Sequence, residues 1–167
     1  MTNKDFINKI IINEISSMID AGFQYFAFIL ITQSIETLGA IIDNKPLKAK
    51  SQSKQRFASA LYKLFPGRYS FLNKNNWLYD KLRNQVVHVL YPSSSIHIIN
   101  NKEDKSHLQF ENNILKIHIY DYYKDLVNAA EKTLVFLEKK DNLEKEIPFC
   151  FHIESLLNSA NEQKSDH

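Results

Sequence analysis

The chain has 167 residues, of which 44% are hydrophobic and 24% charged, a composition typical of one globular domain with a sizeable core. It contains only three glycines and four prolines, too few for an all-β fold with many tight turns, so we expect a mainly helical fold. The single cysteine, Cys150, excludes an internal disulfide and a zinc site built from cysteine pairs, which favours a cytoplasmic setting.

Two helices are predicted in the first 43 residues, the first amphipathic and the second apolar in its N-terminal half. Apolar residues recur at helical spacing over 4–19, and the charged residues among them argue against a secretory signal. Gly22 marks a break, and a second helix is predicted from there to about Asp43. Its apolar run, 21–31, is shorter than a membrane-spanning helix requires, so we expect a buried core helix and no membrane anchor.

Proline and glycine divide the middle of the chain. Pro46 ends the second helix, and a third helix is predicted over about 51–65, before Pro66. The stretch RYSFLNKNN is predicted to be a loop, and a fourth helix covers about 75–91.

The hydrophobic period then changes from helical to alternating. Two alternating runs within about 107–119 surround Asn112-Asn113 and predict a small β hairpin, to which SIHII adds a possible third strand. Helical spacing returns from Asp121 to about Lys140. We therefore predict one domain over 1–140, a bundle of about five helices with the hairpin inserted before the last long helix. Residues 141–167 form a C-terminal extension, predicted to be partly disordered, with an apolar patch at 149–157.

Charge is distributed unevenly along this domain. Residues 44–79 contain eight basic and no acidic side chains, whereas the other 131 residues carry 13 basic and 19 acidic ones. Such segregation favours an anionic partner, although a solvated lysine-rich loop and helix face gives the same pattern. The residues that we assign to phosphate contact are Lys45, Lys48, Lys50, Lys54 and Arg56.

The fourth predicted helix has two unlike faces. At helical spacing, one stripe is apolar and is predicted to enter the core: Leu78, Leu82, Val86 and Val89. Asn84 and His88 lie one turn apart on the opposite side, with Arg83 at the edge of their face. The same non-core side carries apolar residues, which predicts contact with another helix, a second subunit or a ligand: Trp77, Val87 and Tyr91.

An arginine, an asparagine and a histidine in this arrangement support a definite chemistry. The planar arginine side chain can hold a phosphate while the imidazole moves a proton near neutral pH. The reaction that fits, without a metal ion, is attack of an RNA 2′-hydroxyl on its adjacent phosphate.

The segment RNQVVH, residues 83–88, resembles the Arg-x4-6-His motif of the HEPN family (higher eukaryotes and prokaryotes nucleotide-binding domain). Many members are metal-independent endoribonucleases, often toxins or phage-defence effectors, that act as dimers with two motifs facing one cleft. The resemblance implies catalytic roles for Arg83 and His88 and a supporting role for Asn84. It also implies a homodimer, and an antitoxin or a nucleotidyltransferase as a possible further partner.

Several other residues are candidates for supporting roles. Glu36 either orients Arg83 or joins Thr32 and Gln33 in a solvated polar stripe, and Asp80 can form an ion pair with Arg83 or with a neighbouring cation. Trp77 is a candidate for stacking on RNA bases, although aromatic residues at helix starts more often join the core. The predicted strands contain three histidines, His97, His107 and His118, whose spacing does not suit a metal site. Neither a metal nor another cofactor is therefore expected.

The sequence thus favours a dimeric HEPN-type endoribonuclease that acts on RNA. Two alternatives remain open. One is a non-catalytic HEPN-like module that binds nucleic acid or protein through the same face. The other is a purely structural helical interaction protein, which exposed apolar residues on the fourth helix would suit.

Overall fold

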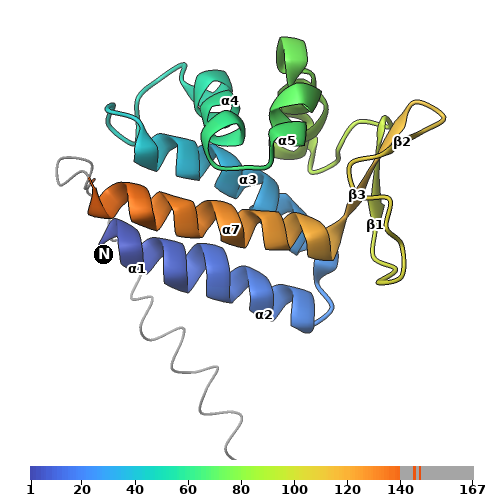
Figure 1. The fold of residues 1–167 in the computed structure, drawn as a ribbon, viewed down its shortest axis with the longest axis horizontal. Coiled ribbons are helices and arrows are strands. Elements are labelled where there is room, and N and C mark those ends of the chain that lie inside the picture. The colour runs from blue at the N-terminus through green and yellow to red at the C-terminus, as the bar shows by residue number, and fades with distance from the viewer. Residues whose placement is uncertain (140–144, 146, 148–167) are drawn as a thin grey trace, which may run out of the picture.

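The computed structural model describes residues 1–139, 145 and 147, so nearly all of the predicted C-terminal extension, including its apolar patch, lies outside the described residues. Long helices lie side by side, and a small sheet sits at one end of them (Figure 1). The last long helix, α7 (Ile119–Glu138), lies between the N-terminal helical segment and α3 (Gln24–Ile42) in this view. The predicted fold class, mainly α with a small β element before the last long helix, is confirmed.

The N-terminal helical segment comprises α1 (Asn3–Phe6), the π-helical η1 (Ile7–Glu14) and α2 (Ile15–Asp20). The Thr2 hydroxyl caps it by accepting a hydrogen bond from the Asp5 backbone N–H at 3.0 Å. Gly22, with a positive φ of 85°, makes the predicted break before α3. Isoleucines at every fourth position form the buried face of this segment: Ile7, Ile11, Ile15 and Ile19.

Helix α3 is the central helix of the bundle and packs against α4 (Ser53–Lys63) and α7. It is the one described helix long and apolar enough to span a membrane by length and composition, but 61% of that window is buried inside the protein. Burial of this kind is typical of a core helix, as the sequence predicts. Gly39 lies where α3 crosses α4, and a Cβ there would come within 2.7 Å of the Arg56 carbonyl carbon.

Arg56 anchors the loop between α3 and α4. Its guanidinium is buried and donates to Asp43 at 2.7 Å and to the carbonyl oxygens of Leu47 and Pro46, each at 2.7 Å. Lys145 donates to the same Asp43 carboxylate at 2.6 Å. Partial burial acts to raise the pKa of Asp43, but the hydrogen bonds from Arg56 and Lys145 outweigh it, and the pKa lies below its ordinary value of 3.8.

The Asp43→Asn variant is expected to lose about 2 kcal/mol of stability at neutral pH, because Arg56 loses a charged partner. Since the folded-state pKa is lowered, the contribution of Asp43 is complete above pH 3.8 and is lost as the pH falls through the folded-state value. Denaturant unfolding at neutral pH and below pH 3.8 gives the free energies of unfolding of the wild type and the variant. The gap between these two free energies should narrow in acid. A gap that stays constant with pH would contradict the assignment.

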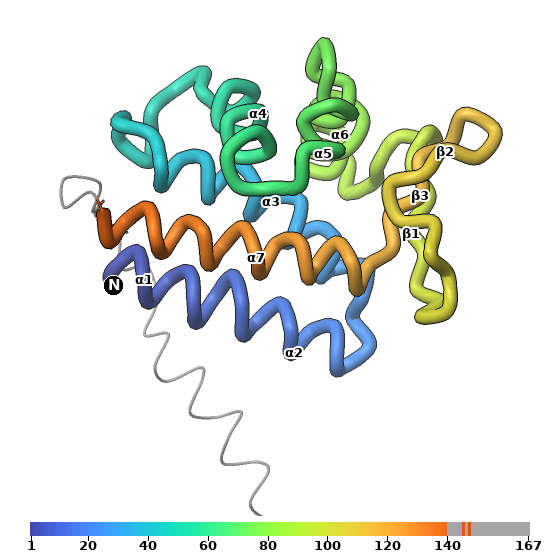
Figure 2. Tube along the Cα trace, viewed as in Figure 1, coloured from blue at the N-terminus to red at the C-terminus, as the bar shows by residue number. Residues whose placement is uncertain are grey.

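The chain between α4 and the sheet is more helical than the sequence predicts. A short helix, α5 (Gly67–Leu72), and a 3-10 turn, η2 (Lys74–Asn76), occupy the predicted loop. The predicted fourth helix consists of the π-helical η3 (Tyr79–Asn84) followed by α6 (Gln85–Val89). Figure 2 shows α6 beside α5, on the same side of α3 as α4.

The π-helical turns change which residues of this helix face the core. Leu78, Leu82 and Val86 are fully buried, as predicted, and Tyr79 joins them with 6% of its surface exposed. The prediction for Val89 is wrong, because 61% of this residue is exposed. A π-helix bonds residue i to residue i+5, so the 3.6-residue wheel loses register along the segment.

The sheet follows, with strand order β1-β3-β2. Strand β1 (Ile96–Ile99) is parallel to β3 (Ile114–His118), and β2 (Phe110–Glu111) is antiparallel to it. The hairpin of β2 and β3 turns at Asn112-Asn113, both with positive φ, as a two-residue type I′ turn requires. The predicted hairpin and its turn are therefore confirmed.

Candidate active site

The candidate site is built on the helix formed by η3 and α6, which we call the motif helix. It lies antiparallel to α3, because two contacts join the helices in opposite order. Arg83 pairs with Glu36 far along α3, and the Tyr25 hydroxyl near the start of α3 donates to the carbonyl of Leu90. Partial burial, with the nearby Tyr91 as a smaller cause, raises the pKa of Tyr25, which keeps this hydroxyl a neutral donor.

The arginine of the motif is held on two sides. Its Nη2 lies 2.6 Å from Oε2 of Glu36, and both side chains are mostly buried. On the other side the guanidinium lies over the ring of Tyr79, 5.5 Å from its centroid. The pairing of Glu36 with Arg83, one of the two alternatives for Glu36, is thus present. Thr32 is buried and bonded to Tyr122, so it does not belong to a solvated polar stripe.

One donor of Arg83 remains unused. Its Nε is buried and has no hydrogen-bond partner among the described residues. A buried donor without a partner costs about 1–3 kcal/mol, so the hydrogen bonding of Arg83 is incomplete in this arrangement. The Nη1 nitrogen has only a long contact, 3.5 Å, with the Tyr79 hydroxyl.

The other two motif residues face outward. His88 is exposed in the last turn of α6, and Asn84 is partly exposed one turn before it. Within the described part of the chain, no hydrogen bond or ion pair holds either side chain. The motif therefore offers a fixed arginine and a free imidazole on one helix.

One lysine of the basic segment 44–79 contacts the start of the motif helix. Lys54, on α4, lies 3.3 Å from Asp80 and 5.6 Å from the centroid of the Tyr79 ring, so Asp80 pairs with Lys54 and not with Arg83. Three more predicted phosphate ligands are exposed and lie in the loop between α3 and α4: Lys45, Lys48 and Lys50. Arg56 differs, because its buried guanidinium already donates to Asp43 and to the loop carbonyls. We therefore define the basic surface as the four exposed lysines, Lys45, Lys48, Lys50 and Lys54.

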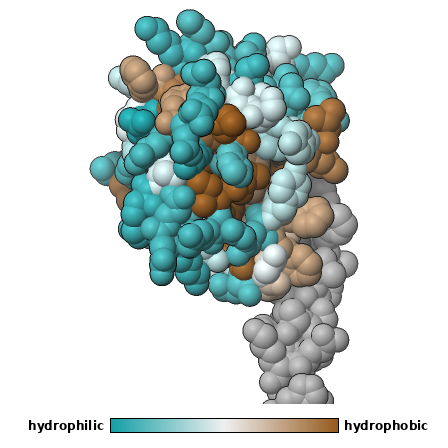
Figure 3. All heavy atoms as spheres, turned by 90° about the vertical axis from the view of Figure 1, so that its right-hand side faces the viewer, coloured by the Kyte–Doolittle hydropathy of each residue, from teal (hydrophilic) through white to brown (hydrophobic). Residues whose placement is uncertain are grey.

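Trp77 is less exposed than a helical wheel suggests. It is half-buried, packs partly against the core, and meets the ring of Phe110 from β2 edge to face at 5.7 Å. The hairpin therefore covers part of this side chain. Figure 3 views the end of the molecule that carries the sheet and shows apolar surface gathered among hydrophilic side chains there.

Two histidines of the sheet region, His107 and His118, form hydrogen bonds, whereas His97 is exposed. His107 accepts from the His118 backbone N–H through Nδ1 at 3.1 Å, and its Nε2 lies 3.0 Å from the Tyr69 hydroxyl. Burial, followed by the charge of Asp125, raises the pKa of Tyr69 well above its ordinary value, so this hydroxyl stays a neutral donor to Asp125. Among the described residues, no three His, Cys, Asp or Glu side chains gather as a metal site would require.

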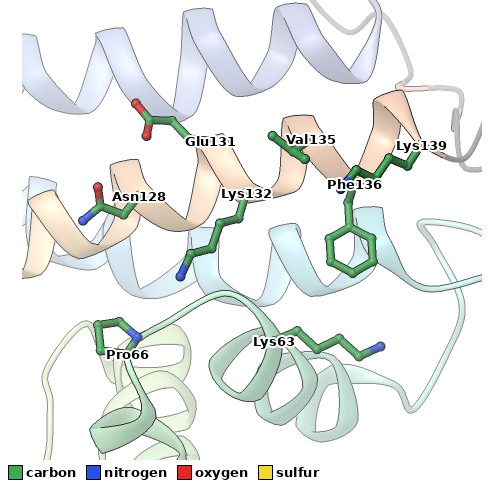
Figure 4. Close-up of a pocket in the computed structure, with 8 residues that line it drawn as sticks. All are labelled: Lys63, Pro66, Asn128, Glu131, Lys132, Val135, Phe136 and Lys139. Atoms are coloured by element: carbon green, nitrogen blue, oxygen red, sulfur yellow. The ribbon is translucent and has the colours of Figure 1, made fainter.

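A groove of about 760 Å³ lies elsewhere, between α7 and the α4–α5 connection (Figure 4). In Figure 4, Lys132 reaches from α7 toward the turn that carries Pro66, and its ammonium donates to the Leu64 carbonyl at 2.9 Å. Val135 and Phe136 contribute apolar surface. None of the three motif residues lines this groove, so it is a separate surface.

Comparison with known proteins leaves the motif as the main clue to function. No protein-family model, no curated protein and no solved structure matches this chain. The likeness to the HEPN family therefore stands on the residues of RNQVVH and on their place in a helical bundle.

Proposed function

We propose that this protein is a metal-independent endoribonuclease of the HEPN type, acting in toxin–antitoxin or phage-defence systems. One observation carries the proposal. Arg83 contacts both Glu36 and Tyr79 on the helix that presents Asn84 and His88 to solvent, and the exposed Lys54 lies against the same Tyr79 ring. An oriented arginine beside a free imidazole suits a reaction that needs charge stabilisation and proton transfer on one phosphate.

In the proposed reaction, the RNA 2′-hydroxyl attacks the adjacent phosphorus while its proton passes to His88, which acts as the general base. The P–O5′ bond breaks, and the 5′-oxygen of the departing chain takes a proton from water, which leaves a 2′,3′-cyclic phosphate on the upstream fragment and a 5′-hydroxyl on the downstream one. Arg83 binds the phosphate oxygens and stabilises their growing charge, and Asn84 supports the phosphate or the imidazole by hydrogen bonding.

The substrate reaches the site along the basic surface. Exposed lysines bind backbone phosphates without regard to base sequence, which gives affinity that falls steeply with salt. The residues that we propose for this contact are Lys45, Lys48, Lys50 and Lys54. The half-buried Trp77 retains an exposed part for contact with an RNA base.

We further propose that two copies of the chain associate through the motif helix and the adjoining part of α3. Among the described residues, the imidazole of His88 has no hydrogen-bond or ion-pair partner. A second copy of the chain would supply such a partner. Helix α3, the motif helix and the residues just after it expose large apolar side chains to a degree unusual for a solvated surface. These residues are Phe26, Leu30, Val87 and Tyr91, with exposed fractions of 55, 40, 38 and 62%.

The Phe26→Glu variant is expected to convert a dimer into a monomer at micromolar concentration, because a charge placed in an apolar interface loses its water without gaining a partner. Light scattering coupled to gel filtration measures the mass. Phe71→Glu is the matched control, since Phe71 is 73% exposed on α5, and it should leave the mass of the wild type unchanged. A monomeric wild type, or a dimer that both substitutions leave intact, would contradict this interface.

The test of the proposed function is incubation of the purified protein with mixed cellular RNA in the presence of EDTA. Cleavage by the wild type is the expected result, and loss of cleavage in the His88→Ala variant assigns it to the motif. A folded dimer that binds RNA in a salt-dependent way but cleaves none would favour the second candidate, a binding-only HEPN-like module, for which the exposed lysines suffice.

A further inference from the structure

Two cationic side chains, those of Arg83 and Lys54, contact the ring of Tyr79. The guanidinium of Arg83 lies 5.5 Å from the centroid of this ring, and the ammonium of Lys54 lies 5.6 Å from the same centroid. Both distances are within the range at which a cation is attracted by the negative face of an aromatic ring. The cations come from different helices, one from the motif helix and one from α4.

The ring of Tyr79 is itself fixed. Only 6% of the residue is exposed, and the ring meets that of Phe57 edge to face at 5.5 Å. Its backbone N–H donates to the side-chain oxygen of Asn73 at 2.9 Å, which sets the start of the π-helical turn. A buried ring with both neighbours in place is a rigid support.

An aromatic face differs from a carboxylate as a support for a cation. It attracts the charge but accepts none of the directed hydrogen bonds that a carboxylate takes, so the N–H donors remain available to a phosphate. Each cation also has a carboxylate beside it, Glu36 for Arg83 and Asp80 for Lys54. The ring is the feature that the two cations share.

We propose that Tyr79 is a positioning residue that holds Arg83 and Lys54 at a fixed separation, so that they bind two phosphate groups of one nucleic-acid strand. This deepens the proposed function and rests on it only in taking RNA as the ligand. Arg83 takes the phosphate that reacts, and Lys54 takes another phosphate of the same strand. The role of Lys54 is thereby more specific than general attraction, because it sets where the strand lies relative to the motif.

The experiment measures binding of a 2′-O-methyl RNA oligonucleotide, which cannot be cleaved by 2′-hydroxyl attack, by fluorescence anisotropy. Tyr79→Phe keeps the ring, removes the hydroxyl that lies 3.5 Å from Arg83 Nη1, and serves as the reference variant. Replacing Tyr79 by pentafluorophenylalanine keeps the shape and reverses the charge distribution of the ring, and should weaken binding about tenfold relative to Tyr79→Phe. Thermal unfolding of the two variants, which differ only in fluorine, controls for stability.

The same pair is then compared in a chain that also carries Arg83→Ala and Lys54→Ala. In that chain the difference in oligonucleotide affinity between the two ring variants should shrink to less than about twofold, because neither cation remains to interact with the ring. Equal binding by the two ring variants, an unchanged difference in the chain without the cations, or failure of the wild type to bind the oligonucleotide would each overturn the proposal. Binding without any cleavage of ordinary RNA would refute the ribonuclease and leave the role of Tyr79 standing.

Discussion

Arg83→Ala and His88→Ala are each expected to lower the rate of RNA cleavage by at least about a hundredfold, His88→Ala by up to about ten-thousandfold. His88 supplies the proton transfer, and its exposed side chain makes no described contact, so its removal should leave the melting temperature unchanged. Arg83→Lys should not restore activity, because an ammonium group lacks the planar pair of donors that grips a phosphate.

Initial rates on a labelled RNA measure these effects. His97→Ala is the matched control for His88, since His97 is an exposed histidine on β1 and should keep the wild-type rate. Arg83 needs a second control, because its removal leaves Glu36 unpaired in a mostly buried position. The double variant Arg83→Ala with Glu36→Gln should regain stability and stay inactive. Wild-type rates in either single variant would remove the residue concerned from the mechanism.

Gly39→Ala is expected to destabilise the protein by about 3 kcal/mol, because the added methyl group overpacks the contact between α3 and α4. Alanine is the better helix former by about 1 kcal/mol, so helix propensity alone predicts the opposite sign. The loss arises because the added Cβ would come within 2.7 Å of the carbonyl carbon of Arg56, and neither backbone can retreat without parting α3 from α4.

Gly67→Ala is the matched control for that substitution. A Cβ at Gly67, the first residue of α5, has no atom within 4 Å, so the change should be neutral or slightly stabilising. Denaturant unfolding of both variants gives the free energies of unfolding. Equal stability of the two alanine variants would mean that the helices do not cross as closely at Gly39 as described.

Local sequence signals predicted the features that depend on neighbouring residues. Isoleucines four residues apart give the N-terminal helical segment, and Asn112-Asn113 between alternating runs gives the hairpin. The burial of α3 follows from an apolar run without charges. In each case the pattern and the structure that it produces lie within one segment, so periodicity and turn chemistry suffice.

Features that depend on distant residues or on helix register escaped prediction. Helical spacing of about 3.6 residues placed Val89 in the core, whereas the structure buries Tyr79 there. The difference arises because residue spacing does not signal a π-helical turn. The burial of Arg56 depends on Asp43, thirteen positions earlier, and on loop carbonyls that periodicity cannot place. The pairing of Glu36 with Arg83 was one of two open possibilities until the antiparallel packing of α3 and the motif helix decided between them.

The residues of the motif helix are proposed to cleave RNA through attack of the RNA 2′-hydroxyl on the adjacent phosphate, and the roles of the other residues depend on this reaction. The most direct measurement is the chemistry of the fragment ends after incubation of the wild type with RNA in EDTA. We predict a 2′,3′-cyclic phosphate on each upstream fragment, a 5′-hydroxyl on each downstream one, and no fragments with His88→Ala. Fragments with 5′-phosphate and 3′-hydroxyl ends, or fragments that His88→Ala still produces, would contradict it.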